Sequence, residues 1–307
     1  MSDPFDVAII GGSFAGLTAA LQLGRASRRT VVLDAGRLRN RFSAAAHSVP
    51  GWDGVPPQEI LARFRSDLSA YPAVRILETT VTGAHGSIDG FTLDLDSGAP
   101  VRARRILLAH GIRDVLPPIP GLADGWGRTV LHCPYCHGYE VRGHPLAVLA
   151  TEPMATHQTH MLRTDWSEDV TLLTNGVEGF DPAELNAAGL KVEDRLPVAM
   201  ESGDGMRVRF AEGPEAEFAA IFVASRPDMT GSPAEVLGVA LSDGPLGPFV
   251  STGPMMQTSV PGVFAAGDLA TPAHSVNVAI GDGARAGIGC HQSLLFPGFV
   301  QPLEVAA

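Results

Sequence analysis

The chain has 307 residues, 45% of them hydrophobic, and its 33 acidic and 22 basic side chains give a net charge of -11. This length and apolar content predict a globular protein of two domains. The sequence has no concentrated basic stripe that could follow a phosphate backbone, so we expect no nucleic-acid partner. Three cysteines are too few for a secreted disulfide scaffold, which favours a reducing, cytoplasmic location.

The apolar stretch from Phe5 to Gly24 differs from both a signal peptide and a membrane span. It follows Asp3, contains Asp6 and is interrupted by glycines. A signal peptide would begin with a basic region, and a span would be continuously apolar. We therefore expect a soluble protein with no membrane partner.

The first unit of structure is a predicted strand, turn, helix and second strand. The strands cover residues 6–10 and 30–34, and the helix covers residues 17–25. The turn Gly11–Gly16 matches GxGxxG except that Ser13 replaces the second glycine. Asp34 ends the second strand, 23 residues after Gly11, where it could accept from ribose hydroxyls. The order of these features predicts dinucleotide binding.

A second glycine and acid pair occurs late in the chain. An apolar strand leads into Gly267 and Asp268, and a helix is predicted over residues 276–295. The pattern places the Asp268 carboxylate beside backbone that the glycines of the predicted helix allow to approach closely.

Two of the three cysteines, Cys133 and Cys136, form a CxxC pair. Such a pair can close a small disulfide ring and exchange with another dithiol, and a helix that starts at the second cysteine would lower its thiolate pKa. Three alternatives remain open. They are a mixed zinc site completed by His132, His137 or His144, a c-type haem attachment at CxxCH, and two buried core cysteines. We expect no metal.

The order of these motifs resembles that of low-molecular-weight thioredoxin reductases and related two-domain flavoproteins. The resemblance covers nearly the whole chain, and the block Thr258–Asp268 is its most specific part. It implies an α/β fold of two Rossmann-like, three-layer domains, FAD as cofactor and a homodimer. It also implies Asp34 on the adenosine ribose, Asp268 near the ribityl chain or pyrophosphate, and Val81 near adenine. The implied FAD-binding residues are Gly11, Ser13, Phe14, Ala15, Gly16, Asp34, Ala35, Val81, Ala109, Gly111, Gly267, Asp268, Ser275 and Val276.

One position departs from the family pattern. Where the family has Ala-Thr-Gly after a strand, this chain has Ala109-His110-Gly111. The role of His110 is left open by the sequence.

A middle unit repeats the strand, helix and strand pattern over residues 146–150, 154–163 and 170–174. In thioredoxin reductases this unit binds NADPH, but here Ala150–Ala155 contains no glycine. Pro153 removes an amide donor and Glu152 would repel an anion. We expect a degenerate NADPH site that retains only the scaffold.

The proline cluster at residues 117–120 and the Gly and Pro cluster at 244–248 predict the domain boundaries. The FAD-binding domain would be discontinuous, comprising residues 1–116 and 248–307. Residues 117–247 would form the middle domain that carries the CxxC pair.

A flavoprotein with a CxxC pair and no NADPH site resembles the dithiol oxidases of the gliotoxin and holomycin type. His137 follows the second cysteine, where thioredoxin reductases have Asp, and its imidazole could exchange protons with a dithiol. The alternative is a histidine that only caps or packs at the helix start. We expect catalysis by Cys133, Cys136 and His137.

The favoured hypothesis is an FAD-dependent oxidase that converts a small-molecule dithiol to a disulfide, with O2 as acceptor and H2O2 as product. A thioredoxin-like protein is the other candidate partner. The rival enzyme is a reductase that takes electrons from NADPH or another donor, and the rival of another class is a non-catalytic flavin-binding redox sensor.

Overall fold

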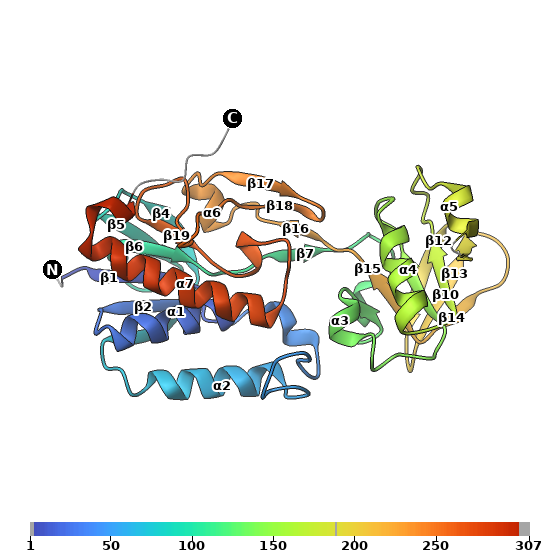
Figure 1. Ribbon diagram of the computed structural model, residues 1–307, viewed down its shortest axis with the longest axis horizontal. Helices are drawn as coiled ribbons and strands as arrows, with labels where there is room; N and C mark the ends of the chain where they lie inside the picture. The colour runs from blue at the N-terminus through green and yellow to red at the C-terminus, as the bar shows by residue number, and fades with distance from the viewer. Residues whose placement is uncertain (1–2, 188, 301–307) are drawn as a thin grey trace. The chain divides into compact units, whose positions relative to one another are not determined.

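The computed structural model describes residues 3–187 and 189–300 and divides into two compact units (Figure 1). The first unit comprises Met1–Arg39, Gln58–Arg113 and Pro227–Ala307. The second comprises Asn40–Pro57 and Asp114–Arg226.

The compact units divide the chain near the first predicted domain boundary and about twenty residues before the second. The chain enters the second unit after Arg113 and leaves it after Arg226, at the paired strands β7 (Arg113–Val115) and β16 (Arg226–Asp228). The domain division at residues 116 and 248 stays a prediction. Its outermost residues, 1–2 and 301–307, lie outside the described part of the chain.

The first unit is built on a sheet of seven strands, most of them parallel. Its path runs β3-β2-β1-β6-β5-β4, and β19 pairs with β6 off this path. The strands of this sheet are β1 (Phe5–Ile10), β2 (Thr30–Asp34), β3 (Val74–Glu78), β4 (Val81–His85), β5 (Phe91–Leu95), β6 (Val101–Leu108) and β19 (Val263–Ala265). The smaller elements of the first unit are α6 (Pro233–Val236), β17 (Leu241–Gly244), β18 (Gly247–Val250), η3 (Asp268–Ala270) and η4 (Pro297–Val300). The short helix η1 (Arg39–Phe42) begins on the last residue of the segment Met1–Arg39 and continues into the second unit.

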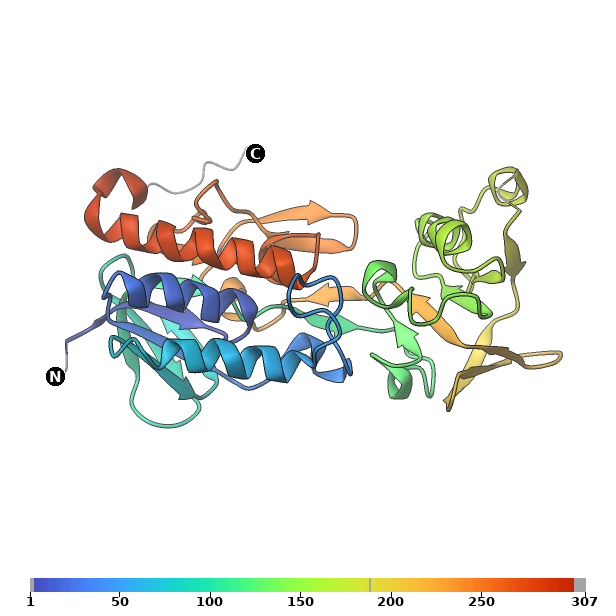
Figure 2. The same cartoon turned by 60° about the horizontal axis from the view of Figure 1, so that its bottom comes forward.

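Three longer helices complete the first unit: α1 (Phe14–Arg25), α2 (Pro57–Leu68) and α7 (Val276–Leu295). Helices α1 and α7 lie side by side (Figure 2). Their close approach depends on glycines, because a Cβ on Gly283 would lie 2.2 Å from the carbonyl oxygen of Ala15. Gly287 meets Ala19 in the same way one turn further along.

The second unit contains a parallel sheet in the order β11-β10-β9-β15-β8 and an antiparallel sheet β12-β13-β14. The parallel strands are β8 (Val130–Leu131), β9 (Leu146–Leu149), β10 (Val170–Leu173), β11 (Lys191–Glu193) and β15 (Ala220–Val223). The antiparallel strands are β12 (Pro197–Ser202), β13 (Met206–Phe210) and β14 (Ala216–Phe218). The helices are η2 (Ala123–Gly125), α3 (Pro134–His137), α4 (Ala155–Asp165) and α5 (Pro182–Ala187).

Both faces of the second unit's parallel sheet are covered. Leu146 and Val148 of β9 pack in one core cluster with Leu162 of α4. Their neighbours Ala147 and Leu149 pack in another cluster with residues of the antiparallel sheet. This alternation is the ordinary consequence of side chains pointing to opposite faces of a strand. It yields three layers, and the predicted α/β class is confirmed.

No helix in residues 3–187 and 189–300 combines the length and apolar character needed to cross a membrane.

Candidate functional site

Most of the residues expected to bind FAD lie near one edge of the first unit's sheet. Strands β1, β6 and β19 run parallel in register, so Ile10, Leu108 and Ala265 are neighbours at their carboxyl ends. The glycine turn, the His110 segment and the Gly267 turn follow these three strands directly. Ligands of parallel α/β sheets bind at this edge.

The glycine turn allows close approach of backbone. Gly11 has φ +110°, and a Cβ there would lie 2.2 Å from the carbonyl oxygen of Ala109. A Cβ on Gly16 would lie 1.9 Å from the carbonyl oxygen of Gly11. The first bond of α1 runs from the Leu17 amide to the Ser13 carbonyl, 2.9 Å. The amides of residues 14–16 therefore precede the helix's own hydrogen-bond ladder and can serve an anion.

Asp34 is fixed beside this turn. Its side chain is only 7% exposed, and its Oδ1 accepts from the Gly36 amide at 3.1 Å. Its Oδ2 accepts from the guanidinium of Arg65 on α2. A Cβ on Gly12 would lie 2.6 Å from this carboxyl group. The sequence did not identify Arg65, because its pairing with Asp34 joins residues 31 positions apart.

The Gly267–Asp268 turn lies against α1. Gly267 has φ +81°, and a Cβ there would lie 3.1 Å from that of Ala15. Asp268 Oδ2 accepts from Nη1 of Arg39 at 2.8 Å. Arg39 is a second cation that sequence reasoning missed, since 229 residues separate it from Asp268.

The remaining predicted FAD contacts differ in their surroundings. Phe14 packs edge-on against Phe64 of α2, so its amide is the group left for a ligand. Ser275 caps α7 by accepting from the Val278 amide at 3.1 Å. The other positions are Ala35, which is exposed, Val81, which begins β4, Ala109, which is buried, Gly111, which has φ +70°, and Val276, which begins α7.

His110 follows β6 between the glycine turn and the Gly267 turn. Its Nε2 is buried, with no hydrogen-bond partner among the described residues. Burial lowers the pKa of His110 to about 4, although a bond with the Gly111 backbone opposes the shift. The same edge of the sheet holds an uncharged imidazole with an unbonded nitrogen, a glycine turn with available amides, and two acids. These features fit a bound dinucleotide.

The CxxC pair lies in the second unit as a Cys133–Cys136 disulfide with Cα atoms 5.3 Å apart. Both cysteines are half-buried, which does not agree with the alternative of two core cysteines. The short helix α3 starts at Pro134, so Cys133 takes its N-cap position. The helix therefore starts before the second cysteine, because Pro134 already supplies a helical φ at its first position.

His137 ends this helix, and its Nε2 lies 3.3 Å from Oγ of Ser43. Burial is the largest influence on its pKa and lowers it. The Glu140 carboxylate and the Cys133 backbone raise the pKa, while His47 and His132 lower it. The net effect lowers the pKa of His137, so its neutral form, which can accept a proton, is favoured at neutral pH.

Segment Asn40–Pro57 supplies further groups to this site. Ser48 Oγ donates to the Tyr135 carbonyl at 3.4 Å. His47 lies 3.6 Å from Glu140 through Nε2 and 3.6 Å from Asp53 through Nδ1. This segment carries no sequence signal that links it to the CxxC pair, because 94 positions separate Ser43 from His137.

The turn before α4 differs from the turn before α1. The amides of residues 155, 156 and 157 donate to the carbonyls of residues 152, 153 and 154 at 3.0–3.2 Å. These amides are therefore not available to donate hydrogen bonds to a phosphate. The carboxylate of Glu152 lies in this turn, 4.0 Å from Arg226.

Within the described residues, no group of three His, Cys, Asp or Glu side chains is placed to hold a metal ion. The third cysteine, Cys290, is buried in α7, and burial raises the pKa of its thiol. It is thus poorly suited to thiol exchange.

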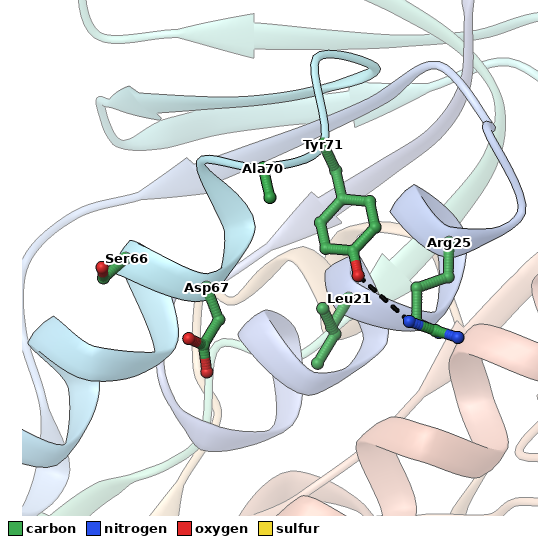
Figure 3. Close-up of a pocket in the computed structure, with 6 residues that line it drawn as sticks. All are labelled: Leu21, Arg25, Ser66, Asp67, Ala70 and Tyr71. Carbon is green, nitrogen blue, oxygen red and sulfur yellow. Dashed lines mark hydrogen bonds between the residues drawn. The ribbon is translucent and has the colours of Figure 1, made fainter.

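A pocket of about 410 Å³ lies between α1 and α2 (Figure 3). The pocket lies at the C-terminal end of α1. Arg25 and Tyr71 line it, and Arg25 donates to the Tyr71 hydroxyl at 3.1 Å. The glycine turn is at the opposite end of α1. None of the predicted site residues lines this pocket.

The likeness to known proteins extends over nearly the whole chain. The family of pyridine nucleotide-disulphide oxidoreductases matches residues 5–151. Thioredoxin reductase tcpT of Claviceps purpurea is 36% identical, and thioredoxin reductase sirT of Leptosphaeria maculans is 32% identical, each over 93% of both chains. A solved oxidoreductase from Agrobacterium tumefaciens is 44% identical, with a TM-score of 0.91 over 96% of this chain and 100% of that chain.

The protein is an FAD-dependent oxidoreductase, and the glycine turn before α1 fits its cofactor. The chain belongs to the family of thioredoxin reductase-like flavoproteins.

Proposed function

We propose that the protein oxidises dithiols to disulfides through Cys133, Cys136 and FAD, with O2 as terminal acceptor and without NADPH. The contrast between the two nucleotide-type turns carries this proposal. The turn before α1 leaves amides available, whereas the α4 amides are bonded within their own turn beside Glu152.

The cysteine pair would act in two exchange steps. A substrate thiolate attacks Sγ of Cys133, the S–S bond breaks, and Cys136 leaves as a thiolate. The second substrate thiolate then attacks the mixed disulfide and releases Cys133. Two electrons have moved from the substrate to the pair.

His137 would take up the thiol proton and return it to the cysteines, as its burial and lowered pKa favour the neutral base. FAD, when bound, supplies the two-electron oxidant that re-forms the Cys133–Cys136 disulfide. The overall balance is one dithiol and one O2 converted to one disulfide and one H2O2.

The experiment compares two electron donors. Anaerobic stopped-flow mixing with a dithiol such as dithiothreitol should bleach the flavin band, and mixing with NADPH should leave it unchanged. In air, the dithiol should sustain O2 consumption and peroxide formation. Cys133→Ser and Cys136→Ser should retain FAD and lose turnover, whereas Cys290→Ala should keep it.

Two outcomes would contradict the proposal. Rapid bleaching by micromolar NADPH would favour a reductase, which the names of the relatives tcpT and sirT support as the second candidate. A thioredoxin-like protein would then be the substrate. A single reduction by dithiol without turnover in air would instead indicate a redox sensor.

Two further features stay predictions from the family resemblance and the composition. A homodimer is expected, and sedimentation equilibrium measures it directly. A cytoplasmic location is expected from the small number of cysteines.

A further inference from the structure

We propose that His47, on segment Asn40–Pro57, is a positioning residue that acts with Glu140 to set the protonation of His137 during thiol exchange at Cys133–Cys136. The inference rests on the proposed role of His137. It extends the dithiol site to a part of the chain that the CxxCH motif does not include.

The geometry places His47 between two carboxylates. Its Nε2 lies 3.6 Å from Oε1 of Glu140, and its Nδ1 lies 3.6 Å from Oδ1 of Asp53. The side chain of His47 is 23% exposed, compared with 42% for Glu140 and 70% for Asp53. The Ser48 amide also donates to Asp53 Oδ1 at 2.7 Å, which fixes the loop.

The same segment contacts His137 directly through Ser43, at 3.3 Å from Nε2. Glu140 follows His137 by three residues. The segment therefore reaches His137 by two routes, one through the Ser43 hydroxyl and one through the pair formed by His47 and Glu140.

The charges of this cluster act on His137 in opposite directions. The Glu140 carboxylate raises the pKa of His137, and His47 lowers it. His132 lowers it as well, and the Cys133 backbone raises it, while burial lowers it most. Glu140 and His47 therefore shift the pKa of His137 in opposite directions.

These opposite effects on the pKa of His137 suit the thiol-disulfide exchange. His137 must be neutral before a substrate thiol approaches, and it must hold a proton until a cysteine thiolate takes it back. The Glu140 carboxylate by itself favours the protonated form of His137 and so opposes the effect of burial. Because Glu140 also pairs with the imidazole of His47, its effect on His137 is partly offset. His137 can then cycle between its neutral and protonated states.

The test uses His47→Gln and Glu140→Gln in the FAD-loaded protein without oxygen. The measured quantity is the rate at which dithiothreitol opens Cys133–Cys136, followed by rapid quenching and alkylation of the thiols. Rates are collected from about pH 5 to about pH 9, around the range in which histidine titrates. Each protein is normalised to its own plateau.

The two variants should move the acid limb of the profile in opposite directions. His47 lowers the pKa of His137, so its removal makes His137 easier to protonate and the exchange rate of His47→Gln should be below that of the parent at acid pH. Loss of the Glu140 anion has the reverse effect, so Glu140→Gln should be faster. Each difference should be about 2-fold or more at the midpoint of the parent's acid limb.

The matched controls are His160→Gln and Glu168→Gln, exposed positions of the same unit, whose profiles should superimpose on that of the parent. His47→Asn serves as a second removal of the imidazole and should shift as His47→Gln does. Shifts in one common direction, unchanged profiles, or a parent rate that does not fall toward acid pH would each overturn the inference. Because the readout is the disulfide itself, failure of O2 turnover alone would count only against the oxidase proposal.

Discussion

His110 shows how one residue can depart from the family pattern and still fit the site. Its Nε2 is buried beside the cofactor edge, and burial lowers its pKa from 6.5 to about 4. At neutral pH the ring is therefore uncharged. A neutral ring can approach a ligand as donor or acceptor, depending on which nitrogen carries the proton.

The lowered pKa of His110 predicts a pH-dependent stability. Between about pH 6.5 and pH 4 the unfolded chain binds a proton that the folded chain excludes, so stability is present above 6.5 and is lost as pH falls toward 4. His110→Asn should remove this contribution. The slope of unfolding free energy against pH should then fall by up to about 1.4 kcal/mol per pH unit.

Urea unfolding of parent and His110→Asn at a series of pH values measures this slope. Above pH 7 the two stability curves should run parallel, which serves as the internal control. Curves that stay parallel down to pH 4 would show that His110 takes up its proton as readily in the folded state as in the unfolded state.

Individual strands and helices could be predicted from local signals in the sequence. Residues 30–34 and 276–295 form a strand and a helix with the predicted bounds. An apolar run marks the strand, and Ser275 caps the start of the helix. Helix α1 starts at Phe14, three residues before its predicted start, because the last turn residues already have helical geometry behind the Ser13 cap. Boundaries of this kind depend on backbone geometry that composition does not encode.

Contacts between distant elements could not be read in this way. The ion pairs of Arg39 and Arg65 with the two acids, and the contact of Ser43 with His137, join residues 31 to 229 positions apart. One sequence carries no periodic signal for such pairs. The glycines of α7 are an intermediate case, because the sequence showed them and only the structure shows which of them touch α1.

Gly283→Ala tests the packing of α7 on α1. Its Cβ would lie 2.2 Å from the backbone of Ala15, so the helices must separate. Overpacking of this kind costs about 1–3 kcal/mol, and the displaced first turn of α1 should also release FAD more easily. Urea unfolding and the fluorescence of released FAD measure the two effects.

The matched control for this change is Gly281→Ala on the same helix. No atom lies within 4 Å of its added Cβ. Alanine is the better helix former by up to about 1 kcal/mol, so this variant should be neutral or more stable and should keep its FAD. Equal loss of stability in both variants would show that glycine flexibility, and not the contact with Ala15, is what α7 requires.

The two α/β units differ in the backbone amides that the turn before the first long helix leaves available to a phosphate. In the first unit, glycines leave the α1 amides available and two acids stand nearby. In the second, the corresponding amides are bonded and the unit carries the dithiol. The expected FAD contacts and the proposed site of thiol exchange therefore belong to different compact units.

This division predicts how the cofactor affects unfolding. All the expected FAD contacts belong to the first unit, so FAD should stabilise that unit only. At a free concentration about 100 times its Kd, the gain should be about 2.7 kcal/mol. Differential scanning calorimetry of protein with and without added FAD should show one transition that moves to higher temperature and one that stays.

NADPH at the same concentration provides the comparison. It should move neither transition, because the amides of residues 155–157 are bonded within their own turn. A rise of the second transition with NADPH would show that the turn rearranges to accept a phosphate. A single transition that moves as a whole with FAD would show that the two units unfold as one cooperative body, so that cofactor binding in one supports the dithiol site in the other.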